Sequence, residues 1–187
     1  MPVEASPDAV LVEDFANTRD LRTFIPRNHP ARDGTADEIA SPEALRRWLS
    51  SRGLLPEGVR LDEADHARVA ALRAALRSAL DRGRPGQASA SRPLDGVPLR
   101  VDLAAPGGPR LTVPGTGVDH AIGAICAAAL RMSLTGEWWR LRVCAADDCH
   151  WVFYDKSKPG RGRYCAPDSC GNRVKTREYR RRKAAHA

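Results

Sequence analysis

Apolar residues recur at helical spacing in three segments of the chain. In residues 41–53 they fall on one face, and Ser41 is placed to cap the first turn. In residues 61–83 a longer apolar stripe follows Asp62, which is also a good helix cap. Residues 118–134 are almost entirely apolar, so a helix there must be buried. The pattern therefore predicts three helices in the first three quarters of the chain.

A different periodicity follows between the second and third of these helices. Leu99, Val101 and Leu103 alternate with charged residues, and two glycines at 107–108 precede a second short apolar segment. Alternation of this kind, interrupted by a glycine pair, is typical of a β-hairpin. We expect the hairpin to be small.

Other segments are less regular. Residues 9–21 fit either a short helix or a strand that turns into a loop. Proline and glycine in residues 25–39, and the Gly/Ser/Pro-rich composition of residues 82–93, predict a loop and a connector. No internal repeat is present.

The character of the chain changes after Gly136. An extended stretch, a cysteine pair, an aromatic strand, a Pro/Gly turn and a short return strand follow one another. We therefore predict an α+β protein with two domains, a mainly helical one at 1–135 with a small β-hairpin, and a module at 136–187 that ends in a basic helix.

Four of the five cysteines lie in this module, at positions 144, 149, 165 and 170. Two close pairs separated by a hairpin-length spacer allow Cys144, Cys149, Cys165 and Cys170 to bind one metal ion. A site with four thiolates has no open position for catalysis, so we predict one structural Zn²⁺, with iron or two disulfides as alternatives. Cys126 is expected to be an ordinary core residue, and no set of catalytic residues stands out.

The distribution of charge along the chain is more informative than the overall composition. The chain carries a net charge of +7; residues 140–187 contain 13 Lys and Arg against 5 Asp and Glu, or +8, and residues 1–139 contain 17 against 18, or −1. All the excess positive charge lies at the C-terminal end, which is typical of a protein that binds a polyanion. Double-stranded DNA is the predicted partner.

The candidate nucleic-acid contacts lie on the basic helix and on the turn before it. Arginine suits bidentate contacts with phosphate or guanine. On the helix, residues spaced by three or four positions share a face. The asparagine at the helix start could instead brace the cysteine loop. The predicted contacts are Asn172, Arg173, Lys175, Arg177, Arg180, Arg181, Lys158, Arg161 and Arg163.

Other functions stay open at this point. Aromatic residues of the module could stack on RNA bases, which would suit an RNA- or ribosome-associated zinc protein. A protein-interaction module or an enzyme with a site in the helical domain are further alternatives. In that domain, Asp14, Asn17, Thr18 and Arg19 could line a small-molecule effector pocket or could simply cap helix ends. The helix at 118–134 could serve in a homodimer.

The sequence argues against a membrane protein. No run of 18 apolar residues is present, and the first residues do not resemble a secretory signal. We expect a cytoplasmic protein whose cysteines stay reduced. The abundance of Ala, Arg and Gly favours a GC-rich bacterial genome.

At Cys170-Gly171-Asn172-Arg173 the sequence resembles the CGNR zinc-finger family. The similarity extends over the four cysteines and the final "YRRR", and it includes Phe153, Asp155, Ser157, Arg163 and Tyr164, where the family more often has tryptophan. The segments "DFANT" (14–18), "WLSSRGLL" (48–55) and "LRAALRSAL" (72–80) resemble the ABATE domain that usually precedes this finger. The resemblance implies a treble-clef-like finger and a bacterial DNA-binding regulator of the stress response.

Overall fold

A computed structural model describes residues 3–24, 36–81, 96–97 and 99–185. The connector predicted at 82–93 and most of the loop predicted at 25–39 lie outside the described residues.

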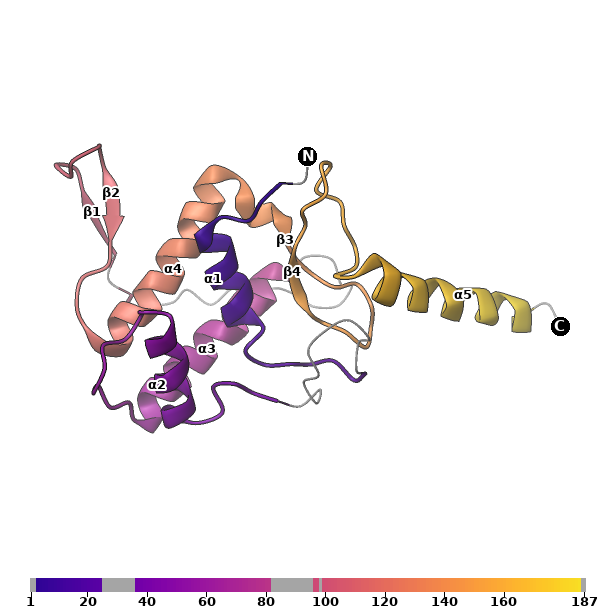
Figure 1. Cartoon of the computed structure of the whole chain (residues 1–187), viewed down its shortest axis with the longest axis horizontal. Coiled ribbons are helices and arrows are strands. Elements are labelled where there is room, and N and C mark those ends of the chain that lie inside the picture. The colour runs from indigo at the N-terminus through magenta and orange to yellow at the C-terminus, as the bar shows by residue number, and fades with distance from the viewer. Residues whose placement is uncertain (1–2, 25–35, 82–95, 98, 186–187) are drawn as a thin grey trace.

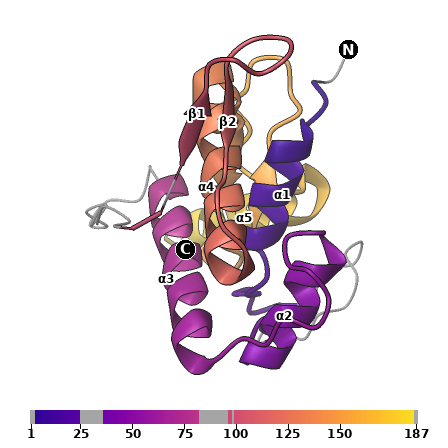
Figure 2. The same ribbon diagram turned by 90° about the vertical axis from the view of Figure 1, so that its left-hand side faces the viewer.

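Four helices form the N-terminal part of the molecule (Figures 1 and 2): α1 (Pro7–Ala16), α2 (Pro42–Ser51), α3 (Glu63–Leu80) and α4 (Gly117–Thr135). The three predicted helices are confirmed, and the ambiguous segment at 9–21 is mostly helix α1. The side chains of Ser6, Ser41 and Asp62 accept hydrogen bonds from the first turns of α1, α2 and α3. Side-chain caps of this kind stabilise a helix start because its first N–H groups lack partners within the helix.

The helices bury their apolar faces against one another. The rings of Phe15 on α1 and Trp48 on α2 lie 5.6 Å apart between centroids. The fully or nearly fully buried residues of this main core are Phe15, Ile39, Leu45, Trp48, Leu49, Leu55, Val69, Leu72, Leu76, Val118, Ala121, Ile122 and Ile125. The core thus contains the apolar stripes that the sequence predicts for α2, α3 and α4.

Two antiparallel hairpins accompany the helices. The first, β1 (Arg100–Asp102) with β2 (Arg110–Thr112), confirms the predicted hairpin and projects from the body (Figure 1). Where the chain leaves β2, Gly123 on α4 allows a close approach, because a Cβ atom there would clash with the Val113 side chain. The short helix η1 (Glu137–Arg140) then leads into the second hairpin, β3 (Leu141–Val143) with β4 (Val152–Tyr154).

The second hairpin shares a buried cluster with the N-terminal helices. Leu141, Val152 and Tyr154 pack together with Val12 of α1 and Met132 of α4. The strands at the start of the C-terminal module are therefore part of a core that the helices also build. The division of the chain at residue 136 stays a prediction.

The chain ends in a long helical segment. A π-helical turn, η2 (Pro167–Gly171), continues directly into α5 (Asn172–Ala185), and no residue of α5 is buried. Figure 1 shows α5 extending away from the body, at the opposite end of the molecule from the β1–β2 hairpin. The α+β fold with a terminal basic helix is thereby confirmed. In the described part of the chain, no helix combines the length and the apolar character that crossing a membrane would require.

Candidate metal centre and basic helix

The four predicted cysteines meet at one point. The Sγ atoms of Cys144, Cys149, Cys165 and Cys170 all lie within 4.8 Å of one another. The distances from the Cys165 sulfur to those of Cys149 and Cys170 are both 3.6 Å. Three of the four residues are buried and Cys165 is half-buried.

This cluster has the dimensions of a tetrahedral zinc site. With Zn–S bonds of about 2.3 Å, the sulfur atoms of a tetrahedron lie ~3.8 Å apart, close to the observed separations. A disulfide would need sulfurs at about 2.05 Å, and none of the four cysteines forms one. Burial, followed by repulsion from the Cys144 thiolate, raises the pKa of the Cys170 thiol. Four thiolates so close together therefore require a cation, and the set suits one structural Zn²⁺.

Local backbone structure brings the two cysteine pairs together. Cys144 directly follows β3, and its N–H donates to the carbonyl of Trp151 across the loop at 2.8 Å. The N–H of Cys149 donates to the Ala146 carbonyl, and the next residue, His150, has a left-handed φ of 54°, which turns the chain back toward β4. Cys170 lies in η2, at the start of the basic helical segment, so the metal anchors that segment to the hairpin.

The turn between the second and third cysteines depends on Asp155. Its buried carboxylate accepts hydrogen bonds from the N–H groups of Ser157 and Gly162. A Cβ atom on residue 162 would lie 2.9 Å from this carboxylate, so glycine is required there. Arg140 and Arg142 donate to carbonyls of the same turn. Burial is the largest single effect on the pKa of Asp155 and would raise it. The hydrogen bonds from Ser157 and Gly162, together with the charge of Arg142, more than offset burial and lower the pKa.

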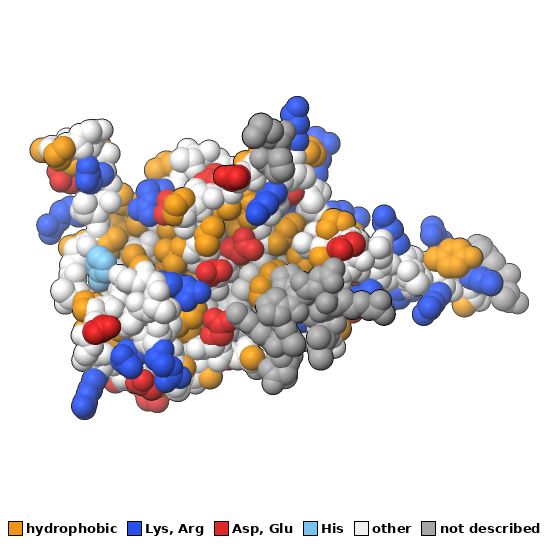
Figure 3. All heavy atoms as spheres, viewed as in Figure 1, with side chains coloured by type: hydrophobic (Ala, Val, Ile, Leu, Met, Phe, Trp, Pro, Cys, Tyr) orange, Lys and Arg blue, Asp and Glu red, His pale blue; other side chains and the backbone are white. Residues whose placement is uncertain are grey.

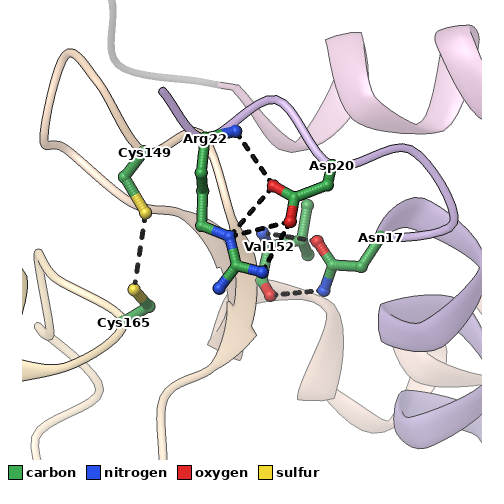
Figure 4. A network of polar contacts seen from close by, with 6 residues as sticks. All are labelled: Asn17, Asp20, Arg22, Cys149, Val152 and Cys165. Atoms are coloured by element: carbon green, nitrogen blue, oxygen red, sulfur yellow. Dashed lines mark hydrogen bonds and ion pairs between the residues drawn. The ribbon is translucent and has the colours of Figure 1, made fainter. Parts of the chain in front are cut away.

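The N-terminal domain holds the finger through Asn17, the residue that follows α1. Its amide nitrogen donates to the Val152 carbonyl at 2.8 Å, and its amide oxygen accepts from the Val152 N–H at 2.9 Å (Figure 4). The backbone N–H and carbonyl of Val152 are thereby both paired, as they would be by a neighbouring strand. Asn17 thus replaces a strand partner at this edge.

A buried ion pair lies beside this contact. The guanidinium of Arg22 bonds both carboxylate oxygens of Asp20, with a shortest distance of 2.6 Å, and the two side chains are 2% and 0% exposed (Figure 4). Arg22 also stacks on Trp151, 4.2 Å from the ring centroid, and the N–H of Thr23 donates to the Asp148 carbonyl. The segment after α1 therefore packs against the metal-binding loop. No local pattern marks Asp20 and Arg22 as a buried pair, because only the fold places them beside that loop.

The four residues predicted to contact a small molecule make protein contacts. The Asp14 carboxylate pairs with Arg52 at 3.2 Å, and the Thr18 hydroxyl accepts from Arg73 at 2.9 Å. Arg19 pairs its backbone with Asp37 in an isolated β-bridge. Together with the hydrogen bonds between Asn17 and Val152, these contacts fit the alternative in which the four residues cap helix ends and brace loops. A ligand role for Asp14, Asn17, Thr18 and Arg19 stays a prediction.

A cavity of about 580 Å³ lies between α1 and the finger. Asp14 lines it, together with Glu13 and residues of the finger that include Trp151, Phe153 and Tyr164. The Glu13 carboxylate accepts a hydrogen bond from the Tyr154 N–H. Burial, only partly offset by that hydrogen bond, raises the pKa of Glu13 from 4.5 to about 7.

We expect the Glu13→Gln variant to lose part of the pH dependence of stability. Between pH 4.5 and 7 the unfolded chain releases a proton that folded Glu13 retains, so the free energy of unfolding falls as pH rises through this window and is flat above it. The amide can still accept from Tyr154 but carries no charge. The free energy of unfolding should be measured by urea denaturation at pH 5 and pH 8. At pH 8 the variant should be more stable than wild type by ~1–2 kcal/mol, and at pH 5 the two proteins should be nearly equal. An identical pH profile for the two proteins would contradict the shift, and Glu57→Gln, at an exposed position, is the matched control.

Two arginines of the predicted DNA-contacting set attach α5 to the finger. Arg173 and Arg177 both donate to the carboxylate of Asp148, at 2.6 and 2.9 Å. Arg173 also stacks on Phe24, 3.2 Å from the ring centroid, and the Asn172 amide donates to the Asp168 carbonyl. Asp148 thereby fixes the direction in which α5 leaves the body.

The remaining cations of this region are exposed. From Asn172 to Ala185, α5 carries seven Lys and Arg and one Glu, a net charge of 7 − 1 = +6. Figure 3 shows basic side chains along its length. The exposed residues are Lys175, Arg180, Arg181, Arg182 and Lys183 on α5, with Lys158, Arg161 and Arg163 on the finger turn. A phosphate backbone could reach both groups.

Four clustered thiols, the last of them at the start of an exposed basic helix, define a zinc finger joined to a helical domain. The family model described as "CGNR zinc finger" matches residues 140–183, and the ABATE model, described as "Putative stress-induced transcription regulator", matches residues 9–147. The chain therefore belongs to the ABATE family and carries a CGNR zinc finger. The two matches overlap on β3, where the structure also joins the two parts. Among curated proteins, no match to this chain was found.

Proposed function

We propose that the protein is a zinc-dependent transcription regulator that binds double-stranded DNA through α5 and the finger turn, without catalytic activity, in the bacterial cytoplasm. The observation that carries this proposal is a helix with a net charge of +6 and no buried residue, anchored at its first turn by a metal cluster. A helix of this composition has little apolar surface to stabilise it, whereas phosphate groups would neutralise its charge.

Rigid attachment of α5 supports recognition rather than loose association. The metal cluster fixes the start of the helix, and Asp148 holds Arg173 and Arg177. The face that these two arginines begin continues outward through Arg180 and Arg181, three and four residues beyond Arg177. We infer that Arg173 and Arg177 mainly position the helix, while the outer cations contact phosphate.

Base stacking on RNA is less well supported. Phe153 and Tyr154 are 9% and 6% exposed, and Trp151 stacks on Arg22. These three aromatic residues of the finger are thus used in packing it. RNA remains the alternative partner that the binding experiment must exclude.

The cavity beside Glu13 is the proposed site for a small-molecule effector. It is lined by both α1 and the finger, so a bound molecule would contact the element that carries α5 as well as the N-terminal domain. Its lining combines aromatic rings with the carboxyl groups of Glu13, Asp14 and Asp155 and the amine of Lys156, which favours a ligand with an apolar body and a polar group.

The DNA-binding proposal predicts a steep salt dependence. Affinity for labelled duplex DNA and for single-stranded RNA should be measured at several salt concentrations, since each phosphate contact contributes about −0.9 to the slope of log K against log salt. Four to six contacts give a slope of about −4 to −5 on the duplex. The Arg180→Ala/Arg181→Ala variant should reduce the slope by ~2 and weaken binding on every duplex sequence.

The matched control is Arg46→Ala/Arg47→Ala, which removes the same charge from α2, far from α5 (Figure 1). It should bind like wild type. Equal losses for the two double variants would show that the effect comes from net charge alone. A flat salt response, or a preference for single-stranded RNA, would overturn the proposal.

A further inference from the structure

The β1–β2 hairpin exposes an unusual amount of apolar surface. Leu99, Val101 and Leu103 are 37%, 60% and 75% exposed. They are three of the nine large apolar residues that are exposed in the described part of the chain, and they lie within five consecutive positions. Figure 3 shows apolar atoms at this end of the molecule. Exposed apolar side chains concentrated on a strand mark a surface that another chain can cover.

The hairpin is also incomplete as a sheet. Among the described residues, β2 is the only strand that pairs with β1, so the sheet has two strands. A two-stranded sheet with one apolar face is marginal in water, and an edge strand offers its free backbone groups to a further strand.

The sequence of β1 identifies that further strand. Residues 99–103 read Leu-Arg-Val-Asp-Leu, which is self-complementary about Val101. If two copies of β1 pair antiparallel with Val101 on the twofold axis, Leu99 lies opposite Leu103 of the other copy. Arg100 then lies opposite Asp102, and Val101 lies opposite itself. Both apolar and charged residues meet favourable cross-strand partners, on opposite faces of the sheet.

We propose that the protein forms a homodimer in which the β1 strands of two copies pair about a twofold axis at Val101, giving a four-stranded antiparallel sheet. The interface is isologous, as closed dimers require. It lies at the opposite end of the molecule from α5 (Figure 1), so both basic helices stay unobstructed. Strands of three residues bury much less than the ~1,200 Å² of a stable complex, and the dimer is accordingly weak.

The proposed surface differs from the one expected from sequence. The apolar face of α4 is largely used inside the monomer, where Val118, Ala121, Ile122, Ile125 and Met132 are buried. The exposed apolar strand is a better candidate because nothing in the described part of the chain covers Val101 or Leu103. This inference does not depend on DNA binding, and its test contains no DNA.

A charge exchange tests the pairing. In sedimentation equilibrium over a concentration series, the average mass of wild type should rise above 20.4 kDa toward twice that value. Arg100→Asp places an aspartate opposite each Asp102 of the dimer, and Asp102→Arg places an arginine opposite each Arg100. Each variant alone should stay monomeric, with an association constant at least tenfold weaker, whereas an equimolar mixture of the two should associate like wild type. Wild type that stays at 20.4 kDa up to millimolar concentration, or a mixture that does not associate, would overturn the proposal.

Asp102→Arg could open the hairpin itself, because Asp102 lies opposite Arg110 and accepts from the Ala104 N–H. A second measurement avoids this variant. In a Cys126→Ala background of the zinc-loaded protein, Val101→Cys should be joined into a covalent dimer by a short bismaleimide. Arg110→Cys, one strand away from the axis, should not. Equal cross-linking of the two variants, or none at position 101, would place the contact elsewhere and reject the β1 pairing.

Discussion

Replacing Cys149 with serine should unfold the C-terminal finger and abolish DNA binding. Cys149 is one of four sulfurs that lie within 4.8 Å of one another. Structural zinc sites have apparent binding free energies of about 10–16 kcal/mol, comparable to the whole stability of a domain, so the loss of a ligand removes much of what holds the finger together. Without the metal, the remaining thiols would have to be neutral, and the start of the basic helix would keep only side-chain contacts such as those of Arg173 and Arg177 with Asp148.

The unfolding should be confined to one end of the protein. Leu141 and Val152 pack in a core shared with α1 and α4, and Asn17 holds β4 independently of the metal. The helices of the N-terminal domain should therefore persist, while the helical signal of the 14 residues in α5 is lost. A chelator should reproduce the effect on wild type.

Circular dichroism and metal analysis check this expectation. Wild type should contain about one zinc per chain and the variant much less. Cys126→Ser is the matched control, because Cys126 packs in the main core and lies outside the cluster. If Cys149→Ser keeps one zinc per chain and binds DNA normally, the structural role of the metal is wrong.

Asp20→Ala should destabilise the protein by about 3–5 kcal/mol. Asp20 and Arg22 are both almost fully buried, and the Asp20 carboxylate is the bidentate partner of the guanidinium. Removing the carboxylate leaves a buried positive charge between α1 and the finger. Arg22 would then have to find water or move off Trp151, on which it stacks at 4.2 Å.

Urea denaturation of two further variants separates the charge effect from packing. Asp20→Ala/Arg22→Met removes the unpaired charge and keeps a long apolar side chain against Trp151, so it should recover at least half of the lost stability. Asp14→Ala breaks an ion pair that is partly exposed, and it should cost less than about 1 kcal/mol. An Asp20→Ala effect no larger than that of Asp14→Ala would contradict the importance of the buried pair.

Local patterns predicted most of the elements. Helical spacing located α2, α3 and α4, and the caps at Ser41 and Asp62 were recognisable because capping depends on only a few neighbouring residues. The cysteine spacing predicted the metal cluster for a similar reason. Two close cysteine pairs joined by a spacer of hairpin length can meet at one metal ion when the spacer forms a hairpin. Residues 9–21 could not be assigned to a helix or a strand from the local pattern. Packing against the core decided for a helix, because α1 buries Val12 and Phe15 there.

Side-chain roles that depend on distant partners could not be predicted. Asn17 was a candidate ligand contact, but the fold places its amide on the backbone of Val152, 135 positions later. Arg173 and Arg177 were predicted to contact DNA, and the fold places Asp148 within reach of both. In each case the sequence indicated a polar group in a special position, and only the fold supplied its partner.

Local patterns were enough to predict α2, α3, α4, the basic terminal helix, the first hairpin, the four cysteines and the excess of positive charge at the C-terminal end, because spacing and charge are local or additive properties. The tertiary structure decided that Asp20 and Arg22 are buried against the finger, that the finger strands share a core with α1 and α4, and that α5 leaves the body in a direction set by Asp148. Those outcomes depend on contacts between segments far apart in the chain, whose free energy appears only once the chain has folded.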